Sequence, residues 1–130
     1  MKYTPINMHK KKSSALVVHY PDPRFQQAYR DTIDELGDYY DLLVFPGASK
    51  AIADHNLVVD NIVLLHSFHG FETIYIMDHT ECGAYGKVDD EVKEHSEYLK
   101  KAELTLKSVL PKIEVKQYLF CENSRLELPA

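Results

Sequence analysis

The chain has 130 residues, of which 45% are hydrophobic and 27% charged, and its net charge is −5. This composition is typical of one soluble globular domain and excludes a mainly disordered chain. The acidic balance argues against nucleic acid as the main partner, and no apolar stretch reaches the roughly 18–20 residues that cross a membrane.

Residues 1–13 are polar and lysine-rich, and we interpret them as an arm that precedes a single domain over residues 14–130. The arm has no apolar segment of the kind that a secretory signal contains, so we expect no such signal. The two cysteines, Cys82 and Cys121, do not make a disulfide framework. Together these features predict a reducing, cytoplasmic compartment.

Short apolar runs alternate with amphipathic segments along the domain. Runs rich in β-branched residues predict buried strands, and apolar residues at helical spacing predict helices. In chain order we expect a strand at 15–18, a helix at 23–36, a strand at 42–45, a helix at 49–69 broken near 54–56, a strand at 73–77, a helix at 87–110 and a strand at 115–121. A turn at Asn123 and Ser124 is expected to lead into a short tail.

This alternation predicts an α/β fold with three layers, in which a central, mostly parallel sheet of four to five strands has helices on both faces. Residues 57–68 are apolar nearly all round, so we expect a second subunit to cover one side of that helix and the protein to be a homodimer. Ligands of such sheets bind at the carboxyl ends of the strands, where the strand order reverses. The loops after the first three strands are therefore the place to look for a site.

Those loops carry side chains that are capable of chemistry. His79 and Cys82 are three residues apart after the third strand, a spacing that lets an imidazole and a thiolate bind one metal ion. Asp22 and Arg24, after the first strand, can pair and hold a carboxylate near that site. The alternative is a turn histidine and a small buried cysteine without a metal.

Residues 74–86, IYIMDHTECGAYG, resemble the signature of the β-class carbonic anhydrases, an apolar strand followed by His-x-x-Cys-Gly. Residues 20–24, YPDPR, align with that family's Cys-x-Asp-Ser-Arg, and the resemblance covers about residues 14–110. It implies a zinc ion on His79 and Cys82, an orienting pair Asp22–Arg24, and a pocket lined by Gly47. It also implies the reversible hydration of carbon dioxide to bicarbonate by metal-bound hydroxide.

One ligand of the family pattern is missing, because Tyr20 stands at the position of the first cysteine. Neutral tyrosine, with a reference pKa of about 10, is a poor zinc ligand at pH 7. The third ligand can then be His19, Asp22, or Tyr20 as a phenolate on a harder metal. Two other hypotheses stay open: a catalytically inactive relative that acts as a binding or assembly protein, and a zinc hydrolase of another small substrate.

Overall fold

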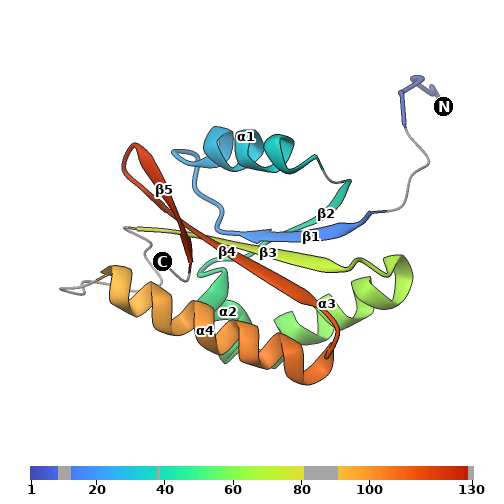
Figure 1. Cartoon of the computed structure of the whole chain (residues 1–130). Helices are drawn as coiled ribbons and strands as arrows, with labels where there is room; N and C mark the ends of the chain where they lie inside the picture. Colours follow the sequence, from blue (N-terminus) through green and yellow to red (C-terminus); the bar gives the residue numbers. More distant parts are fainter. Residues whose placement is uncertain (9–12, 38, 81–90, 129–130) are drawn as a thin grey trace.

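The computed structural model describes residues 1–8, 13–37, 39–80 and 91–128. In this part of the chain it contains a five-stranded sheet in the order β2-β1-β3-β4-β5 (Figure 1). The strands are β1 (Ala15–His19), β2 (Tyr40–Val44), β3 (Thr73–His79), β4 (Glu114–Cys121) and β5 (Ser124–Leu128). The helices are α1 (Gln26–Leu36), α2 (Ser49–Asp54), α3 (Asn56–His69) and α4 (Glu91–Val109).

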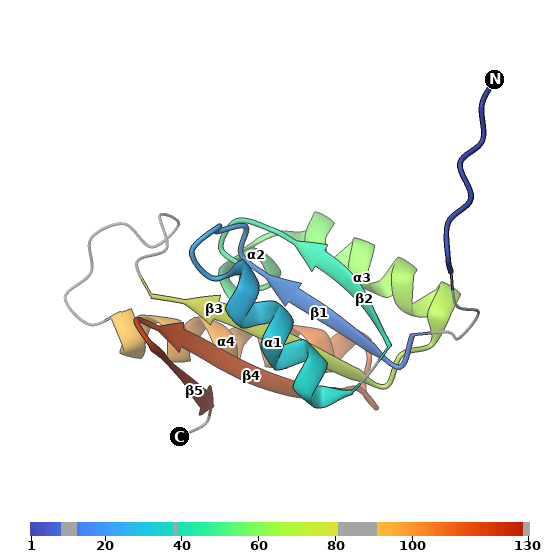
Figure 2. The same cartoon turned by 90° about the horizontal axis from the view of Figure 1, so that it is seen from above.

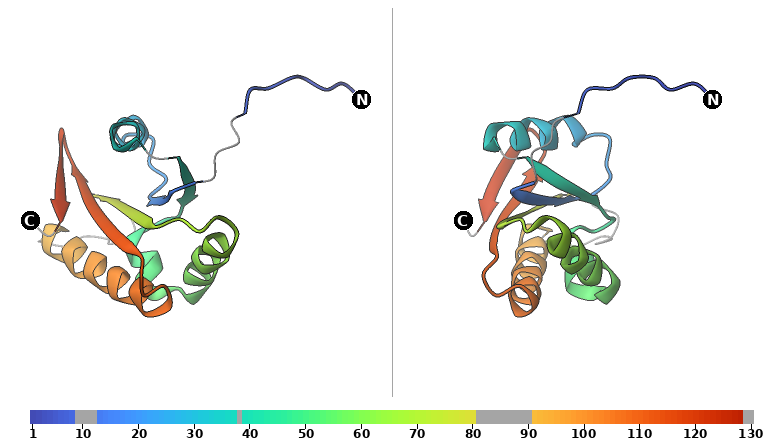
Figure 3. Two further views of the ribbon diagram at one scale, coloured as in Figure 1. Left: turned by 45° about the vertical axis from the view of Figure 1, so that its right-hand side comes forward. Right: turned by 90° about the vertical axis from the view of Figure 1, so that its right-hand side faces the viewer.

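The layers confirm the predicted α/β architecture. Strands β1 to β4 run parallel, and β5 is antiparallel to β4. Helix α1 covers one face of the sheet, while α2, α3 and α4 cover the other (Figures 1 and 3). The central strands are therefore buried on both sides, which is why they are continuous apolar runs in the sequence.

Alternation along β1 divides its side chains between the two cores. Leu16 and Val18 pack on the side of α2 to α4, whereas Ala15 and Val17 pack against α1. Among the described helices, the expected break of the second helical segment falls at His55, which is extended (φ −124°, ψ 106°) and separates α2 from α3. Gly70 then ends α3 in the left-handed conformation with φ 64°.

Several boundaries differ from the sequence prediction. β2 spans Tyr40–Val44 rather than 42–45, and β3 continues to His79, which we expected in the loop after residue 77. The expected tail after residue 123 is the strand β5, which forms a hairpin with β4 through Asn123 at φ 58°. Alternation over only five residues is too short a signal to separate such a strand from a tail. Helix α1 begins at Gln26 rather than at residue 23, and the predicted helical residues 87–90 lie outside the described residues.

The topology places a reversal of strand order between β1 and β3. From β1 the chain passes to its neighbour β2 on one side and then returns to pair with β1 again through β3 on the other side (Figure 2). The carboxyl ends of β1 and β3 therefore border the crevice in which α/β proteins bind their ligands. In the described part of the chain, no helix is both long and apolar enough to cross a membrane.

Candidate metal centre

His79, the last residue of β3, has a side chain that is fully buried. The ring of Phe25, just before α1, stacks on the imidazole with 4.6 Å between centroids and 15° between planes. Tyr20, which follows β1, meets the same imidazole edge-on at 4.8 Å. These two aromatic contacts hold the His79 ring in one orientation at the edge of the β1–β3 crevice.

A hydrogen bond of His79 shows that its Nδ1 carries a proton. Nδ1 lies 2.6 Å from the carbonyl oxygen of Thr80, and a carbonyl can only accept, so Nδ1 is the donor. In a neutral imidazole Nε2 then carries a lone pair. That atom is buried and has no hydrogen-bond partner among the described residues. Metal-binding histidines are held in the same manner, with the second nitrogen donating to a carbonyl.

Asp22 is the charged group next to this lone pair. Arg24 donates to the Asp22 carboxylate from Nη2 at 2.8 Å and from Nε at 3.1 Å, and its backbone N–H donates at 2.9 Å. The side-chain hydrogen bonds from Arg24 lower the pKa of Asp22 to about 2. Asp22 is therefore a carboxylate at neutral pH, and its Oδ2 lies 3.4 Å from Nε2 of His79.

The distance between Nε2 of His79 and Oδ2 of Asp22 indicates whether the two atoms share a proton or could bind one metal ion. A charge-assisted N–H···O bond between an imidazolium and a carboxylate measures about 2.7–2.9 Å, which is shorter than the observed 3.4 Å. Two ligand atoms on a tetrahedral zinc ion, each about 2.0–2.1 Å from the metal, lie about 3.3 Å apart. Two electron-rich atoms otherwise repel each other at this distance, so His79 and Asp22 fit a zinc ion that lies between them.

The other predicted site residues are distributed differently. His19 stacks on Tyr29 at 4.3 Å and donates from Nδ1 to the carbonyl of Tyr20, and burial lowers the pKa of His19. Gly47 lies in the turn between β2 and α2 with φ 88°. Cys82 lies outside the described residues. Within the described ranges, no three His, Cys, Asp or Glu side chains are close enough to hold a metal, so His19 does not join His79 and Asp22 in such a group.

A buried cluster beside this site was not predicted from the sequence. The carboxylate of Asp78, next to His79 on β3, accepts hydrogen bonds from the backbone N–H of Ser49 at 3.0 Å and from the Ser49 hydroxyl. Nδ1 of His95 on α4 lies 2.9 Å from the same carboxylate. A charged residue inside an apolar strand was the signal available in the sequence, because such a residue needs partners when it is buried.

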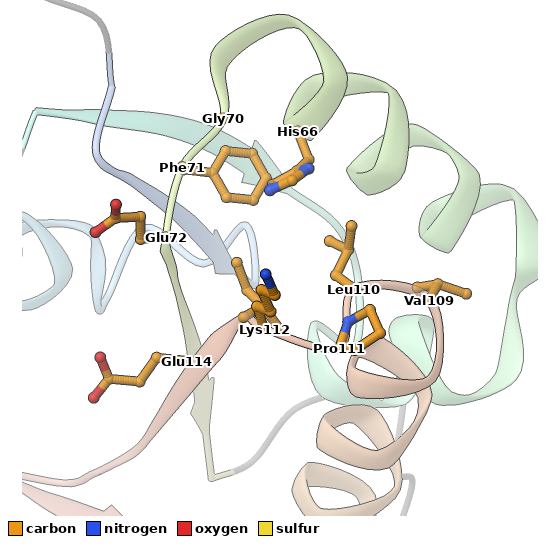
Figure 4. A pocket seen from close by; sticks show the side chains of 10 residues that line it. His66, Gly70, Phe71, Glu72, Val109, Leu110, Pro111, Lys112 and Glu114 are labelled. Carbon is orange, nitrogen blue, oxygen red and sulfur yellow. The ribbon is translucent and has the colours of Figure 1, made fainter.

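A large cavity of about 650 Å³ lies at the other end of the sheet (Figure 4). It is bordered by the residues that precede β3 and β4. His66 packs edge-on against Phe71 there, and Lys112 and Glu114 also line the cavity. This is the amino end of the parallel strands, away from His79. The volume of a cavity therefore does not identify the candidate site. The candidate site is identified instead by the convergence of His79, Asp22 and Arg24.

The fold and the site together define an α/β protein with a histidine–carboxylate centre where its strand order reverses. The chain belongs to the family described as "Putative carbonic anhydrase", whose model matches residues 4–128. An uncharacterized protein of Rickettsia bellii (strain RML369-C) is 29% identical over 125 residues, which cover 83% of this chain and 76% of that protein. One of Rickettsia conorii (strain ATCC VR-613 / Malish 7) is 28% identical over 125 residues, with 83% and 67% covered.

Two solved structures share the fold at low sequence identity. The carbonic anhydrase of Streptococcus mutans superimposes with a TM-score of 0.68 and 18% identity, over 97% of this chain and 87% of that one. The β-carbonic anhydrase isoform I of the protozoan Trichomonas vaginalis gives a TM-score of 0.65 and 13% identity, over 98% and 87%. The resemblance noted in the sequence, to the β-class carbonic anhydrases, is thereby confirmed at the level of family and fold.

The Asp22–Arg24 pair predicts a pH-dependent stability of the metal-free protein. Because the pKa of Asp22 is lowered in the folded state, its contribution is present above about pH 4 and is lost as the pH falls toward 2. Replacing Arg24 by Gln should lower the free energy of unfolding at pH 7 by about 1 kcal/mol, since the Arg24 side chain is half exposed and the pair is partly screened. Urea denaturation of both proteins between pH 7 and pH 3 measures the difference.

Arg30→Gln, an exposed arginine on α1, is the matched control and should change the unfolding free energy little at any pH. If the Arg24→Gln deficit stayed constant down to pH 3, the ionised pair would not be its origin.

Proposed function

We propose that the protein is a zinc-dependent carbonic anhydrase that interconverts carbon dioxide and bicarbonate. One observation supports this most directly: the buried Nε2 of His79, which has no hydrogen-bond partner among the described residues, faces the ionised Asp22 at a separation that two ligands of one zinc ion would have. Membership of the putative carbonic anhydrase family supports the same substrate pair.

The proposed ligands are His79, Cys82 and Asp22. His79 and Cys82 follow from the family signature, and Asp22 takes the place that Tyr20 leaves without a thiolate. We favour Asp22 over His19 because Asp22 lies 3.4 Å from Nε2, whereas His19 is stacked on Tyr29. Three protein ligands with a fourth position open to water are the arrangement of catalytic rather than structural zinc sites.

A bound zinc ion would lower the pKa of water toward 7 and so supply a nucleophile at neutral pH. The chain's own residues prepare this site. Arg24 lowers the pKa of Asp22 and fixes the orientation of its carboxylate through two side-chain donors. Phe25 and Tyr20 enclose His79 and keep bulk water from its ring, which strengthens the electrostatic interactions there.

A catalytically inactive binding or assembly protein is the second candidate, and the replacement of the first cysteine by Tyr20 favours it. In that case His79 and Asp22 would be a remnant of the family site. A zinc hydrolase of another small substrate would share the metal site and differ in the substrate that the pocket admits. We also propose a reducing, cytoplasmic compartment, because a thiolate ligand is lost when it is oxidised.

We further propose that the protein is a homodimer joined near β2 and α3. β2 is an edge strand on which Leu42 and Val44 are exposed. Helix α3 runs along the same edge of the sheet (Figures 2 and 3) and exposes Leu57, Leu64 and Phe68. Leu42 and Val44 lie on the α1 side of the sheet and α3 covers the other face, so exposed apolar side chains flank this sheet edge on both sides, as at an interaction surface.

Zinc binding by the untagged protein tests the proposed site. After removal of metal by a chelator, the wild type should take up about one zinc ion per chain, measured by native mass spectrometry and elemental analysis. His79→Ala should abolish tight binding, and Asp22→Asn should weaken it by about 10- to 100-fold because a neutral amide is a poor ligand. Carbon dioxide hydration, followed by stopped flow, should fall in the same order.

His19→Ala is the matched control and should leave zinc affinity unchanged, because His19 lies against Tyr29. Retained tight zinc in His79→Ala would refute the assignment of ligands. A wild type that takes up no zinc would favour the binding or assembly protein, and zinc without hydration would favour the hydrolase.

The dimer predicts a change in mass when a charge enters the apolar face of α3. Phe68→Glu should convert the dimer into a monomer, because burying an unpaired carboxylate in an apolar interface is costly. Sedimentation velocity on the two proteins measures this. Leu104→Glu, at an equally exposed apolar position of α4, should remain a dimer. A wild-type monomer at micromolar concentration would contradict the proposal.

A further inference from the structure

The buried cluster of Asp78, Ser49 and His95 joins three elements beside the candidate metal centre. All three residues are at most 1% exposed. Asp78 comes from the end of β3, Ser49 begins α2, and His95 lies in α4. Both carboxylate oxygens of Asp78 accept a hydrogen bond, since Oδ1 binds the Ser49 N–H and Oδ2 binds the Ser49 hydroxyl and the His95 imidazole.

The cluster lies where the end of β3 is hydrogen-bonded to a neighbouring strand on one side only. The ladder between β1 and β3 ends at the pair His19–Met77, so Asp78 and His79 lie beyond it. On their other side, both residues are paired with β4, His79 opposite Phe120. The backbone of His79 is therefore held by a strand on one side only, at the point where it must face Asp22 from the β1 side.

The same cluster also fixes the turn that follows β2. Gly47 and Ala48 have positive φ values of 88° and 40°, and Ala48, at ψ −97°, is in a conformation that costs an L-residue about 1–3 kcal/mol. Strained backbone persists only where surrounding contacts hold it. Ser49, the next residue, supplies those contacts through its two hydrogen bonds to Asp78.

We propose that Asp78, with Ser49 and His95, is a positioning device for the metal centre: it holds the free side of the β3 end so that His79 meets Asp22 at ligand distance. This inference rests on the proposed function. Ligands that are held in place before the metal arrives bind it more tightly, because less conformational freedom is lost on binding. Loss of the cluster should therefore weaken metal binding although no metal ligand is removed.

Two substitutions of His95 separate the hydrogen bond from the packing. His95→Phe keeps a ring of similar size and removes the donor to Asp78. His95→Asn loses the ring and keeps an N–H donor at about the distance from Cβ that Nδ1 has. Zinc dissociation constants of the full-length folded proteins are measured by competition with a chromophoric chelator. Cobalt(II) absorption spectra of the same proteins report the ligand geometry.

The wild type and His95→Asn should agree within about threefold in zinc affinity and share one cobalt spectrum. His95→Phe should bind zinc about 10- to 100-fold more weakly, as is typical when an outer partner of a metal site is lost, and its cobalt spectrum should change. Ser49→Ala, which removes one donor and keeps the backbone N–H, should behave in the same direction and replaces His95→Phe if that protein does not fold.

A purely structural cluster would give a different result. It would lower the melting temperature of His95→Phe and Ser49→Ala and leave the zinc affinity and cobalt spectrum of the folded proteins unchanged, which would overturn this inference alone. If the wild type itself bound neither zinc nor cobalt, the proposed function would fail and this inference would fall with it.

Discussion

The candidate site depends on one hydrogen bond, from Nδ1 of His79 to the carbonyl of Thr80. In a neutral imidazole this bond selects the tautomer with the proton on Nδ1, which leaves the lone pair of Nε2 facing Asp22. Arg24 acts on the other partner, because its side-chain hydrogen bonds lower the pKa of Asp22 to about 2 and orient the carboxylate. Without the Thr80 bond, Nε2 could carry the proton of a neutral imidazole and donate it to Asp22. With both contacts present, a cation satisfies them better, and the 3.4 Å separation leaves room for a metal ion.

The parallel sheet explains why these residues meet although 57 positions separate Asp22 from His79 in the sequence (79 − 22 = 57). β1 and β3 are hydrogen-bonded neighbours, and the loops that leave their carboxyl ends therefore start side by side. Alternation along β3 then divides the chemistry between the two faces. His79 is enclosed by Phe25 on the α1 side, whereas Asp78 turns to α2 and α4. The end of β3 thus contributes His79 to the candidate site and Asp78 to the buried cluster beside it.

The sequence was informative where a pattern extends over many residues or a motif carries chemistry. Apolar runs predicted β1 to β4, and the motif residues His79, Asp22 and Arg24 do come together in the structure. The sequence was uninformative where the structure of a segment or the contact of a residue depends on a partner far away in the chain. β5 is a strand because β4 pairs with it, and its five residues carry too little pattern to show this. Asp78 and His95 are 17 positions apart on different elements, so no local spacing links them.

Tyr20 is the residue at which family pattern and structure have to be reconciled. Its ring lies edge-on against His79, so the position still faces the site although it carries no thiolate. A thiolate at this position would bring a second negative charge next to Asp22, and a neutral ring does not. Among the described residues, Asp22 is the carboxylate that forms an ion-pair contact with Nε2, at 3.4 Å. Under the proposed function, the carboxylate of Asp22 would supply the charge that the missing cysteine does not, so the substitution would change the ligand type without emptying the site of negative charge.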